Sequence, residues 1–411
     1  MLDTARPWYR QPLNQRVTTL RPGEDYEIRF VEIGVSMSAT VDALKLHAYR
    51  VSFRTTWIVV EIHTKEGWIG MGECSDVGPV VRVTEETEEV FRLIKDSNLC
   101  ESWQDVDESL WQWSTEATNA SIKFLRRTIM GGVVSAILDI VAQVAEVPLW
   151  EWLGGHWVPE IPLYANINRA PVKRVPSEFA EVALRAVRDG FSAIKLAPFD
   201  GPAIDEMDLV TTGLSHVRAV RQAAGYDVDL YVDVHAHLSR EQIARVIEPL
   251  QELEVVWFED AVDTSIVEDV KWLKSSSVMP LAGGEHIIDL DPFLELRDSG
   301  LLDIMLIDPK HVGGPLRVIE FLRGSSGVDL TYHNPTGPVA TALATHLFTL
   351  HRDCSVLEIA YGEDVRRAEF LNPGETMQEG SLELSTLPGL GVQLSTTSRM
   401  PQSATVSYGH A

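Results

Sequence analysis

Short apolar runs alternate with stretches of helical spacing through the second half of the chain. Between the runs, apolar residues recur every three or four positions, as in 178–188, 240–253 and 316–322. Strands that alternate with helices along a sequence form parallel sheets, and eight such units with no break in composition favour a closed barrel over a doubly wound sheet. The eight strand candidates are 161–167, 191–196, 230–233, 255–259, 280–285, 304–308, 330–333 and 356–359.

A different pattern precedes the predicted barrel. Apolar runs at 44–53, 57–63 and 68–74 predict an antiparallel meander, and helical spacing dominates from 84 to 155. We therefore predict an α/β protein, with a (β/α)7–8 TIM-type barrel and an α+β capping domain. The predicted divisions are an N-terminal extension at 1–40, the capping domain at 41–157, the barrel at 158–362, and a C-terminal segment at 363–411 that packs back on the capping domain and ends in a frayed tail rich in Ser and Thr.

Charge and composition narrow the class of partners. The formal net charge is −25, from 35 Lys and Arg against 60 Asp and Glu. This balance argues against nucleic acid and anionic membranes, because both need clustered cationic side chains. Three cysteines are too few for a disulfide framework, and we expect neither an apolar leader nor a span of about 18 apolar residues. The composition is typical of a cytoplasmic protein.

Three carboxylates end consecutive strand candidates of the barrel. Asp233, Glu259 and Glu285 follow one another at even intervals along the chain. In a parallel barrel the C-terminal tips of the strands meet on one face, where active sites lie. Carboxylates that share one protected mouth repel each other unless a cation joins them, and oxygen ligands suit Mg²⁺ ahead of Zn²⁺. The sequence therefore predicts a metal-dependent enzyme with Mg²⁺ at these three residues.

Other strand tips offer groups for proton transfer. His333 and Asp308 end neighbouring strand candidates, so the carboxylate can orient the imidazole and raise its basicity, as a general base requires. Glu358 lies on the last strand candidate, Lys195 lies near the end of the second, and His235 lies just past the tip of the third. We expect all five side chains to share the mouth of the barrel with the metal site.

The order of these residues resembles the enolase superfamily, in its mandelate racemase branch, from about residue 40 to about residue 395. The resemblance implies that Asp233, Glu259 and Glu285 hold Mg²⁺. It also implies that His333, with Asp308, abstracts the proton α to a carboxylate, and that a protonated Glu358 hydrogen-bonds the developing enediolate. Four phrases are similar to the strand ends of that branch: Trp257-Phe-Glu-Asp260, Gly283-Gly-Glu-His286, Asp308-Pro-Lys-His-Val-Gly-Gly314 and His333-Asn-Pro-Thr-Gly-Pro338.

Two details favour a dehydratase within that branch. Its racemases carry Lys-x-Lys on the second strand, whereas this chain has Lys195-Leu-Ala197, so the second base is missing. Asp233-Val-His235 is similar to the Asp-x-His of galactonate and mannonate dehydratases, whose His protonates a leaving hydroxyl. The resemblance thus implies a lyase that removes water from an aldonic or aldaric sugar acid to give a 2-keto-3-deoxy acid, with Lys195 stabilising the developing charge.

Other functions stay open from the sequence. An epimerase, racemase or cycloisomerase would use Lys195 and His333 on opposite faces of one carbon. His235-Ala-His237 is similar to the zinc pair of metal-dependent hydrolases, although that pair belongs on the first barrel strand. A non-catalytic barrel that binds a metal and a ligand is a third alternative. We expect a small-molecule carboxylate as substrate, loops at 75–77 and within 1–40 that close over it, and a homo-oligomer.

Overall fold

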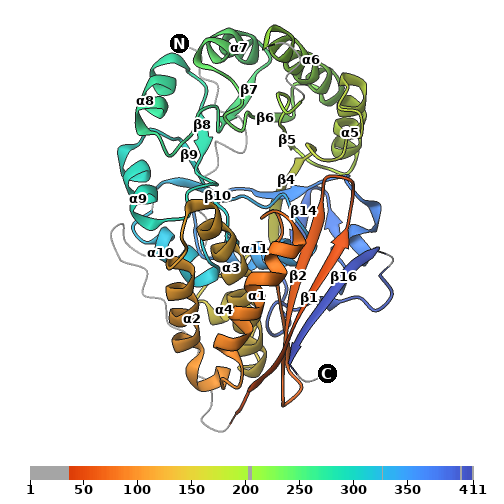
Figure 1. Ribbon diagram of the computed structural model, residues 1–411. Helices are drawn as coiled ribbons and strands as arrows, with labels where there is room; N and C mark the ends of the chain where they lie inside the picture. The colour runs from red at the N-terminus through yellow and green to blue at the C-terminus, as the bar shows by residue number, and fades with distance from the viewer. Residues whose placement is uncertain (1–36, 202–205, 326, 399, 410–411) are drawn as a thin grey trace.

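The computed structural model describes residues 37–201, 206–325, 327–398 and 400–409. The predicted N-terminal extension, with its expected substrate loop, lies outside the described residues except for 37–40. The described chain has two parts that pack together, a ring of parallel strands with helices outside it and an α+β layer (Figure 1). The α/β class with a barrel and a capping domain, predicted from the sequence, is confirmed.

Eight parallel strands form the ring, and they coincide with the eight predicted strands. A helix follows each of the first seven, and a short 3-10 helix at Val365–Glu369 follows the eighth. The strands are β4 (Glu160–Asn166), β5 (Ala193–Leu196), β6 (Asp229–Asp233), β7 (Val255–Glu259), β8 (Leu281–Gly283), β9 (Ile304–Ile307), β10 (Asp329–Tyr332) and β11 (Leu357–Ala360). The helices are α5 (Pro176–Arg188), α6 (Glu206–Ala224), α7 (Arg240–Glu252), α8 (Val267–Ser276), α9 (Leu290–Ser299), α10 (Pro315–Leu322) and α11 (Pro338–Phe348).

Hydrogen-bonded ladders join neighbours around the ring in the order β11-β4-β5-β6-β7-β8-β9-β10. Among the described residues no ladder closes the ring between β10 and β11. One isolated bridge, between Leu330 and Cys354, and a hydrogen bond of 2.6 Å from the Thr331 hydroxyl to the Val356 carbonyl oxygen hold these two strands together. The barrel is therefore complete in its strands but not in its backbone pairing.

Aromatic side chains fill the interior of the ring. Tyr231 stacks on Trp257 with ring centroids 3.8 Å apart, and the edge of Tyr164 meets both rings. Small residues on neighbouring strands, such as Ala193 and Ala282, make room for these rings in the same buried cluster. Because the interior is packed, only the strand tips are left to form a site.

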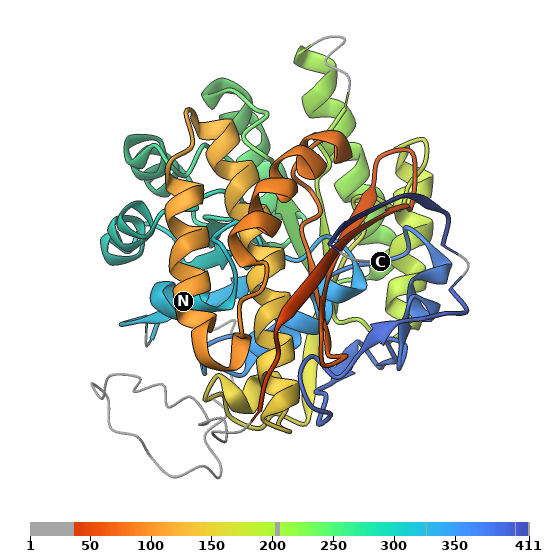
Figure 2. The ribbon, with the colours of Figure 1, turned by 60° about the horizontal axis from the view of Figure 1, so that its bottom comes forward.

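The capping domain is an antiparallel sheet covered by helices (Figure 2). Its strands run in the order β16-β1-β2-β3, and the three predicted strands of the meander are all present. The strands are β1 (Val41–Arg50), β2 (Thr56–Thr64), β3 (Ile69–Glu73) and β16 (Gln402–Gly409), and the helices are α1 (Val80–Ile94), α2 (Leu99–Thr115), α3 (Ala120–Val144) and the short α4 (Leu149–Trp152). The chain between β11 and β16 adds four short strands. Strands β12 (Leu371–Asn372) and β15 (Gln393–Leu394) form a two-stranded sheet, whereas β13 (Met377–Gln378) pairs with β14 (Ser381–Glu383), which also pairs antiparallel with β4.

The expectation of a frayed C-terminal tail is wrong. Residues Gln402–Gly409 form β16, which pairs antiparallel with β1 from Tyr49 to Ala43. The Tyr408 hydroxyl also donates to the Thr84 carbonyl oxygen at 2.7 Å, and its ring stacks on Phe91. Ser and Thr at alternate positions hide the strand in the composition, but the unpaired edge of β1 supplies the backbone partners that stabilise it. The domain boundaries themselves stay predictions.

The central helix of the capping domain, α3, is a long apolar span, although the sequence predicted no span of about 18 apolar residues. By length and composition α3 could cross a membrane, but 94% of its most apolar window is buried inside the fold. It passes this test because it is surrounded by protein on nearly every side, as its burial from Thr128 to Ala142 indicates.

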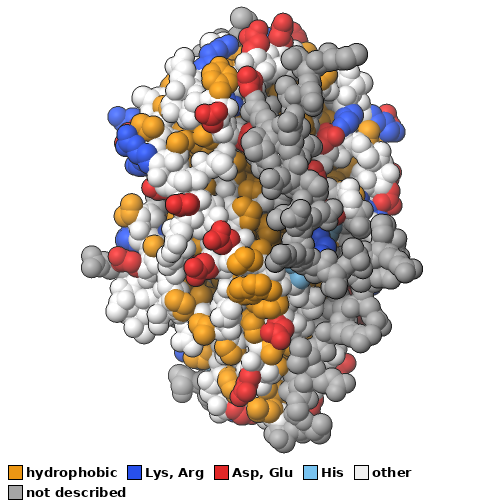
Figure 3. All heavy atoms as spheres, turned by 180° about the vertical axis from the view of Figure 1, so that it is seen from behind, with side chains coloured by type: hydrophobic (Ala, Val, Ile, Leu, Met, Phe, Trp, Pro, Cys, Tyr) orange, Lys and Arg blue, Asp and Glu red, His pale blue; other side chains and the backbone are white. Residues whose placement is uncertain are grey.

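On the face seen from behind, apolar side chains form a band beside the atoms drawn in grey (Figure 3). Extended apolar surface is typical of contact surfaces in proteins. Association into a homo-oligomer stays a prediction, because nothing in a single chain tests it.

Strand β3 lies directly against the backbone of α3. A Cβ atom at Gly72 would lie 1.9 Å from the Gly132 carbonyl oxygen, so only glycine permits this approach. The buried Asp139 carboxylate then joins three segments, because it accepts hydrogen bonds from the backbone N–H groups of Met71 at 2.9 Å and Leu390 at 2.8 Å.

We expect Asp139→Ala to lower the free energy of unfolding by about 2 kcal/mol or more, since it leaves two buried N–H groups without partners. Asp105→Ala, which removes an exposed carboxylate on α2, should change it by less than about 0.5 kcal/mol. Urea unfolding followed by circular dichroism measures both. Equal stability of the two variants would contradict this role for Asp139.

Candidate active site

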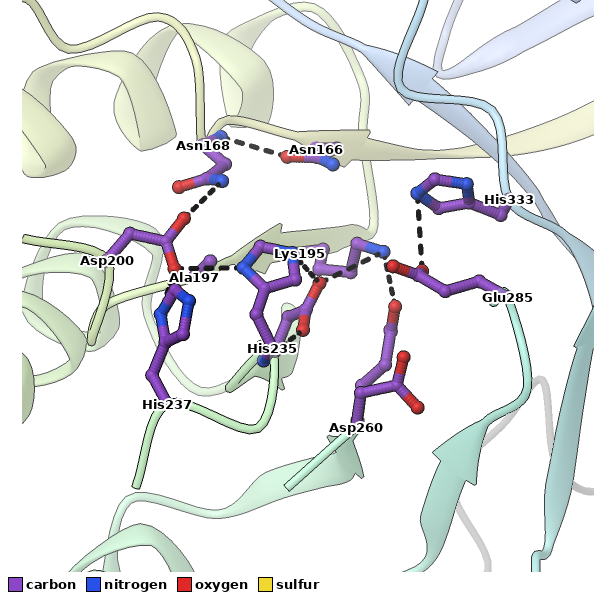
Figure 4. A network of polar contacts seen from close by, with 12 residues as sticks. Asn166, Asn168, Lys195, Ala197, Asp200, His235, His237, Asp260, Glu285 and His333 are labelled. Carbon is purple, nitrogen blue, oxygen red and sulfur yellow. Dashed lines mark hydrogen bonds and ion pairs between the residues drawn. The ribbon is translucent and has the colours of Figure 1, made fainter. Parts of the chain in front are cut away.

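The parallel register of the strands brings the predicted site residues to one face. Asp233 and Glu259 are direct neighbours across the β6–β7 ladder, and Glu285, Asp308 and His333 follow the ends of β8, β9 and β10. Lys195 and Glu358 lie within β5 and β11. Figure 4 shows His333 and Glu285 on one side of Lys195, and His235 with His237 and Asp200 on the other. The structure therefore gathers all of the predicted site residues at the mouth of the barrel.

The Lys195 ammonium lies at the centre of this mouth. Its Nζ is 2.6 Å from Glu259 Oε1, 2.8 Å from Glu358 Oε1 and 3.7 Å from Asp233 Oδ2, and the side chain is 1% exposed. Burial alone would lower the pKa of Lys195, but Glu259 and Glu358 raise it well above the usual range. Lys195 is therefore a fixed positive charge that holds buried carboxylates together.

The surroundings of Glu358 favour its carboxylate form over the protonated carboxyl expected from the sequence. Burial raises the pKa of Glu358, but Lys195 and His333 lower it below the ordinary value. Its oxygens accept hydrogen bonds of 2.7 Å from the Asn166 side-chain amide and from the Asn334 backbone N–H. With donors on both oxygens, Glu358 orients Lys195 and the loop after β10.

Of the three predicted metal ligands, two are adjacent. Ligand atoms of Asp233 and Glu285 lie within 4.8 Å of each other, together with one of His235. Glu259 instead turns to Lys195 and accepts a hydrogen bond of 3.0 Å from the Trp257 indole N–H. Among the described residues, Glu259 joins none of the groups whose ligand atoms are this close.

The donor set nevertheless fits a hard divalent cation. Asp260 Oδ2 is buried and makes no hydrogen bond, and Glu285 Oε2 is buried with the imidazole of His333 3.2 Å away. Burial first, and neighbouring carboxylates second, raise the pKa of Asp260 to about 7 and that of Glu285 well above the usual range. The pKa of Glu259 rises to about 8, because burial outweighs the opposing effect of Lys195. Excess buried carboxylate of this kind is what a bound cation stabilises.

His333 and Asp308 form the predicted dyad. His333 Nδ1 is 2.8 Å from Asp308 Oδ2, while its Nε2 faces Glu285 Oε2 at 3.2 Å. The same Asp308 oxygen accepts from Lys310 Nζ at 2.8 Å and lies 3.3 Å from His311 Nε2. Burial raises the pKa of Asp308, but these cationic neighbours lower it well below its ordinary range. The carboxylate fixes the ring so that Nε2 points into the mouth.

His235 is held between two carboxylates. Its Nε2 is 3.0 Å from Asp233 Oδ2 and its Nδ1 is 2.8 Å from Asp200 Oδ1. Burial would lower the pKa of His235, but Asp233 and Asp200 raise it to about 12. The residue has a positive φ of 50°, and so does the next residue, Ala236, at 52°, a conformation rare for side chains other than glycine. The two carboxylates therefore favour the protonated form of His235, and the backbone turn orients its ring.

The sequence pattern missed two members of the site. Asp200 lies in the loop after β5, far from any regular tip position, and nothing in the sequence pairs it with His235. Asp260 directly follows Glu259, and this acidic doublet was the only signal that could have identified it. Lys310 follows Asp308 by two positions in the sequence, but only the turn after β9 brings its ammonium into contact with the Asp308 carboxylate.

The capping domain reaches the mouth at the end of β3, while closure of the loop at 75–77 over a substrate stays a prediction. Glu73 Oε1 accepts from the Gly337 N–H at 2.7 Å and Oε2 from the Ala340 N–H at 2.9 Å, at the N-terminus of α11. Carboxylates at a helix N-terminus satisfy its free N–H groups and its dipole. Asp76 forms an ion pair of 2.7 Å with Arg169, in the loop after β4.

Two family models match this chain. The N-terminal domain of mandelate racemase and muconate lactonizing enzyme matches residues 35–154, and the enolase C-terminal domain-like model matches residues 178–398. The chain belongs to the mandelate racemase/muconate lactonizing enzyme family of the enolase superfamily. The resemblance inferred from the strand ends is thereby confirmed, and the chain is an enzyme.

Relatives by sequence and by structure agree with this family. The chain is 25% identical over 343 residues to D-gluconate dehydratase of Thermoproteus tenax, covering 82% of this chain and 67% of that protein. It is 24% identical over 349 residues to D-gluconate/D-galactonate dehydratase of Picrophilus torridus, covering 82% and 86%. An enolase superfamily member of Salmonella Typhimurium shares the fold with a TM-score of 0.76, 22% identity, and coverage of 90% and 99%. The 3,6-anhydro-D-galactonate cycloisomerase of Zobellia galactanivorans shares the fold with a TM-score of 0.74 and 21% identity, covering 87% of this chain and 97% of that chain.

We expect Lys195→Met to lower the free energy of unfolding by about 3 kcal/mol without added metal, because Glu259 and Glu358 lose their buried counter-charge. Saturating Mg²⁺ should recover part of this loss, since a cation bound by the carboxylates stabilises only the folded state. Thermal unfolding with and without Mg²⁺ tests both expectations. Lys271→Met, at an exposed ion pair with Glu268, is the matched control and should have little effect.

Proposed function

We propose that this enzyme is a Mg²⁺-dependent dehydratase of sugar acids, a lyase that acts on aldonic acids such as gluconate or galactonate. The observation that carries the proposal is the pairing of two histidines around Lys195: His333 is oriented by Asp308, and His235 carries a proton between Asp233 and Asp200. A base and an acid that act at neighbouring carbons are what loss of water requires. The names of the two dehydratase relatives agree with this chemistry.

Asp233, Glu259 and Glu285 would hold the metal ion, with Asp260 beside them. When bound, Mg²⁺ supplies Lewis-acid stabilisation of the charge that develops on the substrate carboxylate. The buried Asp260 Oδ2, which has no hydrogen-bond partner, and the close approach of Asp233 and Glu285 support a cation at this place. Lys195 adds a positive charge that is present in every protonation state of the site.

Proton transfer then follows from the geometry of the histidines. His333 Nε2 takes the proton from the carbon α to the carboxylate, and Asp308 stabilises the imidazolium through Nδ1. As the electron pair of that C–H bond forms a C=C bond, the C–O bond to the 3-hydroxyl breaks. His235 donates its proton to that oxygen, so water leaves. The enol product tautomerises to the 2-keto-3-deoxy acid, and the atoms balance without a further reactant.

A cycloisomerase or epimerase is the second candidate, favoured by the shared fold with the Zobellia enzyme. That reaction needs a second base on the opposite face. Lys195 is bound by two carboxylates and buried, and Ala197 has no basic group. These contacts favour an electrostatic role for Lys195 and thus favour the dehydratase. A metal-dependent hydrolase has less support, because the acidic ligands outnumber the imidazoles.

A screen of C5 and C6 sugar acids with Mg²⁺ tests the proposal, with 2-keto-3-deoxy acid as the measured product. His333→Asn should abolish both dehydration and exchange of the α-proton with deuterated solvent, since it removes the base. His235→Asn should slow dehydration by about 100-fold or more while α-proton exchange continues. His63→Asn, on β2 of the capping sheet, is the control. Exchange without water loss in the wild type would instead indicate an epimerase or cycloisomerase.

The ion pair between Asp76 and Arg169 supports a monoacid substrate. It joins the capping loop to the loop after β4, and Asp76 is held at φ 68°. Burial raises the pKa of Asp76, but Arg169 first, and then His311, His333 and Lys310, lower it to about 2. The pair is neutral as a whole, so it can bind the hydroxyls at the far end of an aldonic acid without attracting a second carboxylate.

Asp76→Asn should raise the ratio of kcat/KM for aldaric over aldonic acids by about 10-fold, because Arg169 is then free to bind the second carboxylate. Arg169→Gln should move the same ratio in the opposite direction. Steady-state kinetics with a matched pair such as glucarate and gluconate measure both. An unchanged ratio in both variants would contradict the assignment of this pair to the substrate.

A further inference from the structure

Beside the catalytic groups, two imidazoles and one carboxylate converge on one point. Asp200 Oδ1 is 2.8 Å from His235 Nδ1 and 3.2 Å from His237 Nδ1. The three ligand atoms all lie within 4.8 Å of one another. Two imidazole nitrogens with one carboxylate form a set that suits Zn²⁺ and its neighbours in the transition series better than Mg²⁺, once the metal ion has displaced the proton of His235. This group therefore differs in chemistry from the oxygen-rich site beside Lys195.

The backbone fixes the two histidines in this arrangement. Consecutive positive φ values at His235 and Ala236 turn both rings to one side. The turn is held by hydrogen bonds from the Ala236 N–H to the Asp260 carbonyl oxygen at 2.7 Å and from the His237 N–H to the Val234 carbonyl oxygen at 3.0 Å. In an extended strand the two residues of a His-x-His segment lie on one face, with Cα atoms about 6.6 Å apart. Here the turn with positive φ keeps the two rings neighbours, with their centroids 5.8 Å apart.

Asp200 is oriented from its other side. Its Oδ2 accepts from the Asn168 side-chain amide at 3.1 Å, which leaves Oδ1 for the two imidazoles. Arg174 donates to the Asp200 backbone carbonyl oxygen at 2.8 Å and so holds the loop. The guanidinium charge opposes a cation nearby, but the carboxylates of Asp200 and Asp233 both face His235 and outweigh it.

The group is also open to solvent, unlike the buried centre of the mouth. His237 is 51% exposed, His235 28% and Asp200 24%, whereas Lys195 and Glu259 are almost fully buried. A metal ion can therefore reach these ligands directly. The fourth position would face solvent and take water.

We propose that Asp200, His235 and His237 form a transition-metal site of the Zn²⁺ class, and that its occupation inhibits the enzyme by withdrawing the imidazole of His235 from proton donation. The inhibition rests on the proposed dehydratase function; the binding of metal does not. Zinc at this place would take the Nδ1 atom of His235 out of its hydrogen bond with Asp200. The site is thus an inhibitory site at which a transition-metal ion lowers the rate of the reaction.

Cobalt binding tests the site without any turnover. Co²⁺ is titrated into the Mg²⁺-saturated enzyme, and the intense visible absorption of four-coordinate Co²⁺ with imidazole ligands is measured, followed by displacement with Zn²⁺. The wild type should take one such ion. His237→Ala and Asp200→Asn should each weaken its binding by about 100-fold, since losing a ligand costs at least as much as losing a group that only orients one. His63→Ala is the control and should bind like the wild type.

Inhibition by Zn²⁺ is then measured on the same proteins. His237→Ala should keep its Mg²⁺-dependent activity and show a shift in the inhibiting Zn²⁺ concentration that equals its loss of Co²⁺ affinity. Wild-type affinity in His237→Ala, absence of a four-coordinate Co²⁺ band in the wild type, or loss of the band in His286→Ala instead would overturn the proposal. The wild type could show the Co²⁺ band, and lose it in His237→Ala, yet dehydrate no sugar acid. That outcome would support the metal site and refute the proposed function.

Discussion

The site depends on one buried ammonium among several buried carboxylates. Lys195 is within 2.8 Å of both Glu259 and Glu358, and all three side chains are almost completely shielded from water. Ionised groups in such surroundings are strongly destabilising unless each has a partner. Lys195 supplies that partner for the side of the ring formed by β7 and β11. The opposite side is short of positive charge, because Asp260 Oδ2 is buried without a hydrogen-bond partner and Glu285 Oε2 faces the imidazole of His333. That imbalance makes the mouth a place for a cation.

The capping domain shapes the same mouth through hydrogen bonds to backbone groups. Glu73, at the end of β3, holds the first turn of α11, and the loop that leads into this helix begins at His333. Gly72 lets β3 lie against α3, and Asp139 ties that strand to the C-terminal segment. The position of the base thus depends on a continuous chain of contacts through the capping domain. These contacts join the capping domain to the barrel beside the site.

Much of this architecture was predictable because burial imposes a period on the sequence. All eight barrel strands and the three strands of the meander follow apolar runs, since a buried parallel strand has few polar positions. The final strand, β16, escaped prediction because it lies at a sheet edge, where alternate Ser and Thr face solvent and the composition is that of a loop. Its stability comes from the edge of β1, a partner far away in the sequence.

The sequence by itself determined which chemical groups stand at the strand tips, because the strand-helix period repeats and the tips of parallel strands share a face. It identified Asp233, Glu259, Glu285, Asp308 and His333 by position alone. Only the tertiary structure decided which of these groups touch: Glu259 and Glu358 both pair with Lys195, and Asp200 joins His235 from a loop without regular spacing. Charge pairing depends on distances of a few ångströms between side chains from different strands, and no periodic pattern in one strand records them.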